Sequence, residues 1–247
     1  MNNIKSLNEL KEYDWQVSWS GGKDSTATIL KMYEYDIPIK NVIYVRLMFN
    51  NYIPATLPIM TKFVDETINK FNDMGINTIV IYPKLTAIDI ANKIYKKSKF
   101  NDLNGNKYGM SVFTRQYCKL KTIKIETLQQ FVNKDEYHML GYTADEKTRV
   151  NRLNEFKQSV LCTLNLTQKD SFKICNAYNM LSPLYNLGFN RDGCFFCPNA
   201  KNKEREYIKT NYPYLFNEIQ NLIKMCNYDL YSLRLINNWI NDYYKED

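Results

Sequence analysis

Six residues near the start of the chain have the types and the order of a phosphate-binding turn. Residues 20–25 read SGGKDS, directly after the apolar run 15–19 and directly before a stretch with helical spacing. Adjacent glycines permit a tight turn, and a helix that begins there directs its N–H groups and its dipole toward an anion. Donor side chains come from Ser20, Lys23, Ser25 and Thr26, and Gly21, Gly22 and Asp24 complete the loop. The sequence therefore predicts a phosphate site; the alternative is an ordinary glycine turn.

A second constellation contains cysteines with metal-ligand spacing. Cys194 and Cys197, in GCFFCP, would place two thiolates on one metal ion, as a C-x-x-C turn does. Cys118, at a loop-to-helix junction among basic residues, and Cys175 are the candidates for the remaining ligands. A four-thiolate site suits Zn²⁺ or an iron–sulfur cluster, and the residues do not decide between them. The alternative is that these thiols bind no metal and that Cys175 is a small core residue.

A third segment, GYTADEKTRVNR at residues 141–152, follows an apolar strand-like stretch. It places Asp145 and Arg149 near the first loop if both strands belong to one parallel sheet. Arg149 and Arg152 share a helix face and would clamp a phosphate or a transferred adenylyl group. The alternative is a helix start with an acidic first turn and solvated arginines. The chain's one histidine, His138, lies in the apolar stretch and is expected to be a core residue.

Strand-like and helix-like segments alternate through the first half of the chain. Strands are expected at residues 17–19, 41–48, 78–82 and 137–140, and helices at 24–35, 57–74, 86–97 and 119–133. This alternation predicts an α/β fold with a doubly wound, mainly parallel sheet that binds ligands at the carboxyl ends of its strands.

The second half of the chain has a different character. From about residue 151 no clear strand is expected, and helices are expected at 203–224 and 232–244. We therefore predict a nucleotide-binding domain at residues 1–150. A helical region at 151–247 would carry the cysteine site and pack on that domain.

Composition sets the class of protein. The 247 residues are 45% apolar, enough for a full core, and no apolar run approaches the ~20 residues of a membrane span. Without a signal-peptide pattern, the six cysteines fit a reducing cytosol, so a cytoplasmic protein with no membrane partner is expected. The net charge of +7, in basic clusters spread along the chain, and the 20 tyrosines favour a nucleic-acid partner. The alternative is that an AT-rich coding sequence enriches lysine and tyrosine.

Taken together, these residues resemble the phosphoadenosine phosphosulfate (PAPS) reductase family of PP-loop proteins. The resemblance runs through SGGKDST, MFNNYIPATLP, TRQYCKLKTIKIETL, LGYTADEKTR, MLSPLY and RDGCFFCPN, within residues 17–216. It is strongest to a branch from bacterial mobile elements and phages that has a G-C-x-F-C-P-N signature. The resemblance implies an adenine nucleotide α-hydrolase fold, with an adenine nucleotide at residues 20–25 and with Gly141 and Arg149 nearby.

The reaction that the resemblance implies is adenylation of an acceptor with release of pyrophosphate. ATP would bind with Mg²⁺ bridging its phosphates, while Lys23 and Arg149 stabilise the charge of the leaving pyrophosphate. Asp24 and Asp145 would bind Mg²⁺ or a hydroxyl group. A Zn²⁺ site or [4Fe-4S] cluster at the cysteines, and sulfur transfer to tRNA or DNA from a sulfur-donor protein, would complete the activity.

Two departures from the family keep other functions open. The reductases carry a catalytic cysteine in a short motif near the C-terminus, whereas this sequence ends NNWINDYYKED. Relatives with a [4Fe-4S] cluster have two adjacent cysteines where this chain has Tyr117 and Cys118. The alternatives to adenylation are a sulfonucleotide (PAPS or APS) reductase and a non-catalytic adenine-nucleotide-binding module.

Overall fold

A computed structural model describes residues 4–94, 96, 104–113, 118–132 and 136–225. The chain forms two compact units, each assembled from three segments. Unit 1 comprises Met1–Arg46, Pro58–Ile81 and Glu126–Asp192, and unit 2 comprises Leu47–Leu57, Tyr82–Ile125 and Gly193–Asp247. Residue 150, the predicted domain boundary, lies inside the third segment of unit 1, and the division into 1–150 and 151–247 stays a prediction.

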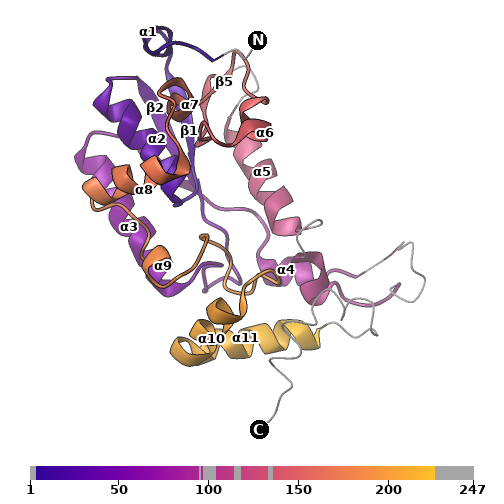
Figure 1. Cartoon of the computed structure of the whole chain (residues 1–247). Helices are drawn as coiled ribbons and strands as arrows, with labels where there is room; N and C mark the ends of the chain where they lie inside the picture. The colour runs from indigo at the N-terminus through magenta and orange to yellow at the C-terminus, as the bar shows by residue number, and fades with distance from the viewer. Residues whose placement is uncertain (1–3, 95, 97–103, 114–117, 133–135, 226–247) are drawn as a thin grey trace. The chain divides into compact units, whose positions relative to one another are not determined.

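Unit 1 is built on a five-stranded parallel sheet (Figure 1). Its strands are β1 (Trp15–Trp19), β2 (Ile39–Val45), β3 (Thr78–Ile81), β4 (His138–Met139) and β5 (Lys157–Gln158). Their order is β3-β2-β1-β4-β5, and every neighbouring pair is parallel. The chain winds from β1 outward to β2 and β3, and then returns to add β4 and β5 on the other side of β1. The predicted doubly wound α/β sheet is confirmed, and its topological switch point lies between β1 and β4.

Helices surround this sheet within unit 1. They are α1 (Leu7–Leu10), α2 (Lys23–Glu34), α3 (Pro58–Asp73), α6 (Lys147–Val150), α7 (Val160–Thr163), α8 (Gln168–Ala177) and α9 (Pro183–Asn186). Helix α2 packs against β1 and against α8. The buried ring of Trp19 lies 5.3 Å, centroid to centroid, from the rings of both Tyr44 and Phe71. The helical spacing of the apolar residues in α3 brings Phe71 to this contact, so the core holds the end of β1 in place.

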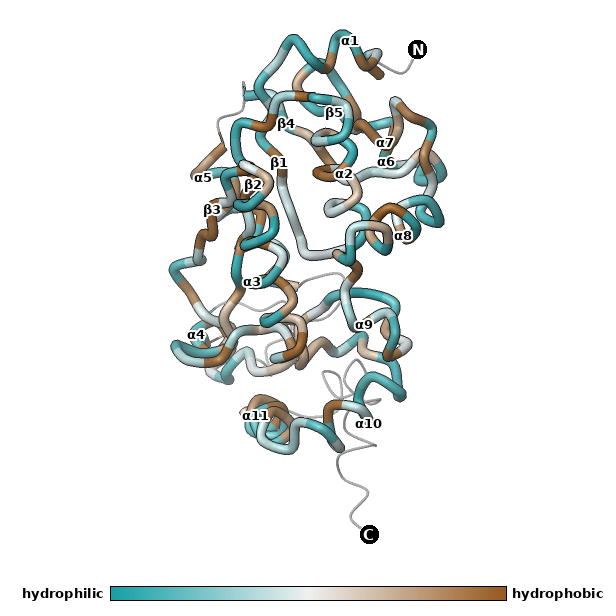
Figure 2. The backbone as a smooth tube through the Cα atoms, turned by 90° about the vertical axis from the view of Figure 1, so that its left-hand side faces the viewer, coloured by the Kyte–Doolittle hydropathy of each residue, from teal (hydrophilic) through white to brown (hydrophobic). Residues whose placement is uncertain are grey.

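Unit 2 has a smaller core of phenylalanines. It contains α4 (Ala87–Ala91), the 3₁₀ helix η2 (Gly109–Phe113), α10 (Asn202–Asn211) and α11 (Pro213–Lys224). The rings of Phe49, Phe113, Phe195 and Phe196 contact one another at centroid distances of 5.0–5.2 Å. Figure 2 shows apolar residues along α11, and four of them, Leu215, Ile219, Leu222 and Ile223, are buried. Helix α5 (Lys119–Phe131) begins in unit 2 and ends in unit 1.

Two of the predicted helices have other bounds in the structure, and one strand was not predicted. The helix expected at 203–224 is two helices, because Pro213 begins α11 and disfavours helical backbone at Tyr212 before it. The helix expected at 86–97 ends at Ala91, and Ile94 instead forms a bridge with Lys107. Strand β5 was not expected, since its Lys-Gln sequence has no strand pattern and only the pairing with β4 defines it. The helix expected at 232–244 lies outside the described residues.

Membrane-spanning helices were searched for in the described part of the chain. None of its helices combines the length and the apolar character that crossing a bilayer requires.

His138 is buried in the sheet of unit 1, as expected. Its Nε2 atom lies 2.6 Å from the hydroxyl of Ser18 on the neighbouring strand β1. Burial and, secondarily, the charge of Lys157 lower the pKa of His138 to about 4, and the charge of Glu136 opposes this shift. The neutral imidazole is therefore the form that the folded protein holds.

The low pKa of His138 predicts a loss of stability in acid. The unfolded chain binds a proton at His138 at about pH 6.5, whereas the folded chain binds it only near pH 4. The contribution of the neutral His138 to the free energy of unfolding is therefore fully present above pH 6.5. It is lost as the pH falls from 6.5 to about 4. The free energy of unfolding should drop by about 3 kcal/mol over this window, from a shift of about 2.5 units. Urea unfolding at several pH values measures it, and His138→Gln should remove this part of the slope. An unchanged slope in His138→Gln would contradict the assignment.

Candidate functional site at the switch point of the sheet

The predicted phosphate loop joins the central strand to the first long helix. Strand β1 ends at Trp19, α2 begins at Lys23, and Gly22 is the N-cap of α2. Gly21 has a φ of +84°, and a Cβ atom there would lie 2.7 Å from the Cε atom of Met60 on α3. The left-handed backbone conformation therefore favours glycine at this position, whereas the terminal methyl group of Met60 belongs to a flexible side chain that can move aside.

The loop is held by its own hydrogen bonds. The backbone N–H of Ser20 donates to the Ser25 hydroxyl at 3.2 Å, and the N–H of Gly22 donates to the Ser20 hydroxyl at 3.3 Å. Thr26 donates its hydroxyl to the Gly22 carbonyl at 3.0 Å and accepts from the indole N–H of Trp19 at 2.9 Å. The buried Trp19 thus anchors the turn. Because Gly22 has no side chain to cap α2, the N–H groups of the first helical turn can bind an anion.

Gly141 brings the end of β4 against the same helical turn. A Cβ atom at Gly141 would lie 2.7 Å from the backbone nitrogen of Ser25 and 2.8 Å from its Cα atom. Real Cβ atoms essentially never come this close to a backbone atom. The glycine therefore allows two backbones to meet at the switch point, which is where open parallel sheets bind their ligands.

Lys23 and Asp24 supply the charges of the loop. The Lys23 ammonium lies 2.7 Å from Asp24 Oδ2 and 5.3 Å above the centre of the Phe172 ring. The Lys23 side chain is only 10% exposed. The other carboxylate oxygen, Asp24 Oδ1, is buried and has no hydrogen-bond partner among the described residues. Such an oxygen is costly to bury, and a cation or a ligand hydroxyl would satisfy it.

Asp145 and Arg149 lie on the segment that follows Gly141, and both are exposed. Asp145 accepts a hydrogen bond from the backbone of Gln168 at 3.3 Å, and its proximity to the Thr143 hydroxyl is the main cause of its lowered pKa. The Arg149 guanidinium pairs with Glu146 at 3.1 Å and lies 5.5 Å from the Tyr142 ring centre. The predicted roles of Asp145 and Arg149 stay predictions.

The four candidate cysteines are divided between the units. Cys175, in unit 1, is buried, and its thiol donates a hydrogen bond to the carbonyl of Lys23 at 3.2 Å. Burial, and secondarily the charge of Asp24, raises the pKa of Cys175 to about 12. This thiol stays protonated in the structure and supports the first turn of α2. Its predicted role as a metal ligand stays a prediction.

Cys118, Cys194 and Cys197 belong to unit 2 and are half-buried. The backbone N–H of Cys197 donates to the carbonyl of Cys194 at 3.0 Å, which closes the C-x-x-C turn. The two residues between these cysteines, Phe195 and Phe196, are buried in the core of unit 2. Within the part of the chain that the structure describes, no three Cys, His, Asp or Glu side chains gather as a metal site. These residues therefore do not by themselves form a complete Zn²⁺ or cluster site.

Sequence reasoning missed three residues of the loop's surroundings. Asp192 accepts a hydrogen bond from Ser182 at 2.8 Å, and its other oxygen lies 3.3 Å from where a Cβ atom of Gly22 would be. Tyr185 is close enough to Asp192 for their charges to interact: burial and, secondarily, the charge of Asp192 raise the pKa of Tyr185. The third is Phe172, beneath Lys23. Asp192 could have been found from its place beside the cysteine motif in RDGC; the two aromatic residues give no local signal.

Comparison with known proteins gives limited information. No family model matches the chain. An uncharacterized protein of Methanocaldococcus jannaschii is 24% identical over 242 residues, which cover 89% of this chain and 50% of that protein. The chain thus spans about half the length of this curated relative. Among solved structures, it is similar to the U34-tRNA thiolase NcsA of Methanococcus maripaludis, determined with its [4Fe-4S] cluster. The two structures align with a TM-score of 0.41 and 13% sequence identity. The alignment covers 97% of this chain and 75% of the NcsA chain. At this level of similarity, a shared activity does not follow.

Proposed function

We propose that the chain is an ATP pyrophosphatase of the PP-loop type, which adenylates an acceptor and releases pyrophosphate. The observation that supports this proposal most directly is the position of SGGKDS at the switch point of a parallel sheet. There the first turn of α2 has no side-chain cap and Gly141 lies against it. The resemblance of this loop to the PP-loop, and of the rest of the chain to the PAPS reductase family, indicates ATP as the nucleotide.

In the proposed mechanism, the loop holds the β,γ-diphosphate. The N–H groups of the first turn of α2 and the ammonium of Lys23 bind its oxygens. A nucleophilic oxygen of the acceptor attacks the α-phosphorus, and the bond from this phosphorus to the oxygen that bridges to the β-phosphorus breaks. Lys23 stabilises the charge that pyrophosphate carries as it leaves, and Arg149 would do so after release from Glu146.

Asp24 suits the cation that this mechanism requires. Its Oδ1 atom is a buried carboxylate oxygen with no described hydrogen-bond donor, and Mg²⁺ prefers oxygen ligands. When bound, Mg²⁺ would neutralise charge on the phosphates. We propose Asp24 as the first ligand and Asp145, which is exposed and carries a lowered pKa, as a second carboxylate that contacts Mg²⁺ or the acceptor hydroxyl.

For the acceptor, we propose a nucleic acid, either tRNA or DNA, that receives sulfur after adenylation from a sulfur-donor protein. The net charge of +7 supports the nucleic-acid acceptor, and the cysteines of unit 2 support the sulfur transfer. No step is assigned to Zn²⁺ or to a [4Fe-4S] cluster, because the described cysteines do not form a complete site. Metal analysis and a visible spectrum of protein purified without oxygen test whether these cysteines hold either one.

ATP–pyrophosphate exchange is the experiment that tests the proposed activity. Purified protein with Mg²⁺, ATP, labelled pyrophosphate and total tRNA or single-stranded DNA as the acceptor should return label to ATP. Both this exchange and pyrophosphate release should depend on the nucleic acid. Sulfite release from PAPS with a thiol donor, in the absence of exchange, would instead identify a sulfonucleotide reductase. Binding of ATP with neither reaction would identify a non-catalytic nucleotide-binding module.

A further inference from the structure

The excess positive charge of the chain belongs to one unit. Unit 2 contains 17 Lys and Arg residues against 9 Asp and Glu, whereas unit 1 contains 16 against 17. Within unit 2 the imbalance is confined to Tyr82–Ile125, which has 10 basic and 2 acidic residues. Basic residues are spread over both units, as expected, but the excess of basic over acidic residues is not. A block with this charge is typical of a surface that binds a polyanion.

Six lysines of this segment are exposed in the part of the chain that the structure describes. Those that the structure describes as exposed are Lys84, Lys93, Lys96, Lys107, Lys119 and Lys121. None of these six forms an ion pair with a described acidic residue. In unit 1, by contrast, Lys23, Lys31 and Lys40 each pair with a carboxylate. These six ammonium groups are thus not held by described carboxylates, although Lys107 donates a hydrogen bond to Asn92 at 2.9 Å.

Two of the most exposed aromatic side chains of the described chain lie in the same unit. Tyr82 is 55% exposed at the start of the basic segment, and Tyr52 is 89% exposed in the segment Leu47–Leu57. The two segments contact each other, since the N–H groups of Ala87 and Ile88 donate to the carbonyls of Met48 and Phe49 at 2.9 Å. Exposed tyrosines beside unpaired lysines suit an unpaired base and its phosphate.

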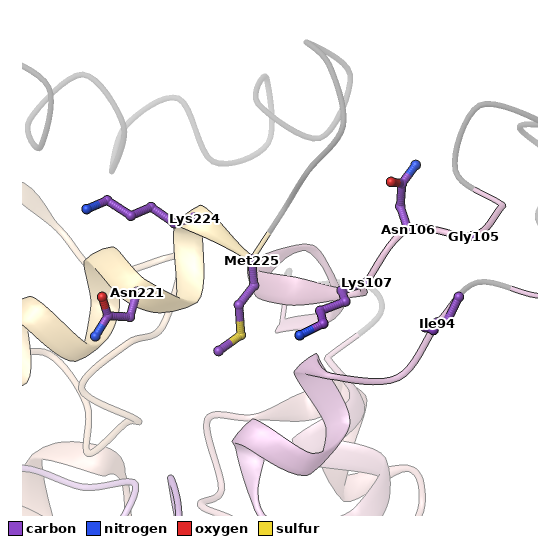
Figure 3. Close-up of a pocket in the computed structure, with 7 residues that line it drawn as sticks. All are labelled: Ile94, Gly105, Asn106, Lys107, Asn221, Lys224 and Met225. Atoms are coloured by element: carbon purple, nitrogen blue, oxygen red, sulfur yellow. The ribbon is translucent and has the colours of Figure 1, made fainter.

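Unit 2 also has a recess of about 600 Å³ that combines these chemistries (Figure 3). Its lining residues are Ile94, Gly105, Asn106, Lys107, Asn221, Lys224 and Met225. Lys107 and Met225 extend toward one another from the two sides, and the bridge between Ile94 and Lys107 shapes the wall formed by the basic segment. The size is within the range of small-ligand sites. Its lining thus includes apolar groups for a base, the Asn221 amide for a base edge and the ammonium of Lys107 for phosphate, whereas the ammonium of Lys224 extends outward in Figure 3.

We propose that the described residues of this segment, 82–94, 96, 104–113 and 118–125, form a binding surface for an unpaired stretch of nucleic acid, with one nucleotide in the recess that Lys107 and Lys224 line. The inference rests on the proposed function, for which it would supply the acceptor-binding surface. Lysines of the segment bind the phosphates and Tyr82 stacks on a base. RNA and DNA share this chemistry, so either can be the natural strand.

Direct binding without ATP tests the surface separately from the reaction at the loop. Fluorescence anisotropy with labelled 20-nucleotide single-stranded RNA, single-stranded DNA and a duplex is measured at several salt concentrations. Lys93→Gln/Lys96→Gln/Lys107→Gln should weaken single-strand binding about 50-fold at 0.15 M salt and reduce the log–log salt slope by about 2, for three lost phosphate contacts. The matched control, Lys11→Gln/Lys62→Gln/Lys169→Gln, removes three exposed lysines of unit 1 and should leave binding unchanged.

Tyr82 distinguishes stacking from general attraction to a polyanion. Tyr82→Ser should weaken single-strand binding by about 5-fold or more, whereas Tyr82→Phe, which keeps the ring, should restore it. Circular dichroism and ATP binding of each variant show that the fold and the loop are intact. The proposal is overturned if the unit 1 control loses as much affinity as the unit 2 variant. It is also overturned if duplex, poly-glutamate or phosphatidylserine vesicles bind as tightly as the single strand. Nucleic-acid binding with no pyrophosphate release would support the surface while rejecting the proposed function.

Discussion

Gly141→Ala is expected to weaken ATP binding at least tenfold and to destabilise the protein by about 1–3 kcal/mol, the usual cost of overpacking a tight contact. The added methyl group would lie 2.7 Å from the backbone nitrogen of Ser25. Because the clash is with backbone atoms, no side-chain rotation can relieve it. The first turn of α2 must therefore move away from the end of β4. This displaces the N–H groups that would bind phosphate, so the affinity for ATP should fall at least tenfold. Calorimetric titration with ATP and urea unfolding measure the two effects.

Gly75→Ala separates this close approach from ordinary backbone strain. Gly75 has a φ of +78°, and a Cβ atom there would meet nothing within 4 Å. Alanine at this position should cost about 1–2 kcal/mol of stability, because of the left-handed backbone alone. ATP binding should be unchanged, since Gly75 follows α3 and does not contact the loop. If Gly141→Ala bound ATP as tightly as Gly75→Ala, the switch-point site would be wrong.

Lys23→Gln is expected to slow pyrophosphate formation by about 100- to 1000-fold, the range for removing one preorganised donor from a transition state. The Lys23 ammonium is almost buried at the start of α2, and the departing pyrophosphate would gain negative charge beside it. Glutamine keeps a polar side chain of similar reach without the charge. Single-turnover measurement of pyrophosphate release, with saturating ATP and the acceptor, reports the chemical step separately from ATP affinity.

Lys31→Gln is the matched control on the same helix. Lys31 lies in the last turn of α2 and pairs with Glu34, so its removal leaves the loop untouched. Its pyrophosphate release should match that of the unchanged protein. Equal rates for Lys23→Gln and the unchanged protein would remove Lys23 from the mechanism, whereas equal losses in both lysine variants would indicate a general effect on α2.

The parallel sheet and the loop were predictable because their signals are local. Alternating apolar and amphipathic segments indicate β1 to β4, and two adjacent glycines between a strand and a helix indicate a tight turn at Gly21. Gly141 was predicted to lie near this loop because the carboxyl ends of parallel strands share one edge of the sheet. The structure brings Gly141 against the backbone of Ser25, and its predicted role in binding the nucleotide stays a prediction.

The features that sequence did not predict depend on contacts between distant segments. Cys175 has the same local pattern whether it binds a metal or supports α2, and only packing shows its thiol bonded to the Lys23 carbonyl. Phe195 and Phe196 read as the interior of a cysteine turn, yet both belong to the core of unit 2. Asp192 reaches the surroundings of Gly22 from 170 positions along the chain, which no local pattern reports.

The identity of the products of ATP cleavage tests the central claim most directly. The protein is incubated with Mg²⁺, ATP and total tRNA or single-stranded DNA, and the phosphorus-containing products are resolved by ³¹P NMR. Cleavage between the α- and β-phosphates predicts two products, pyrophosphate and either AMP or an adenylated acceptor. The Lys23→Gln variant should form neither product at a comparable rate. Formation of ADP and inorganic phosphate, or pyrophosphate at the same rate in Lys23→Gln, would contradict the account.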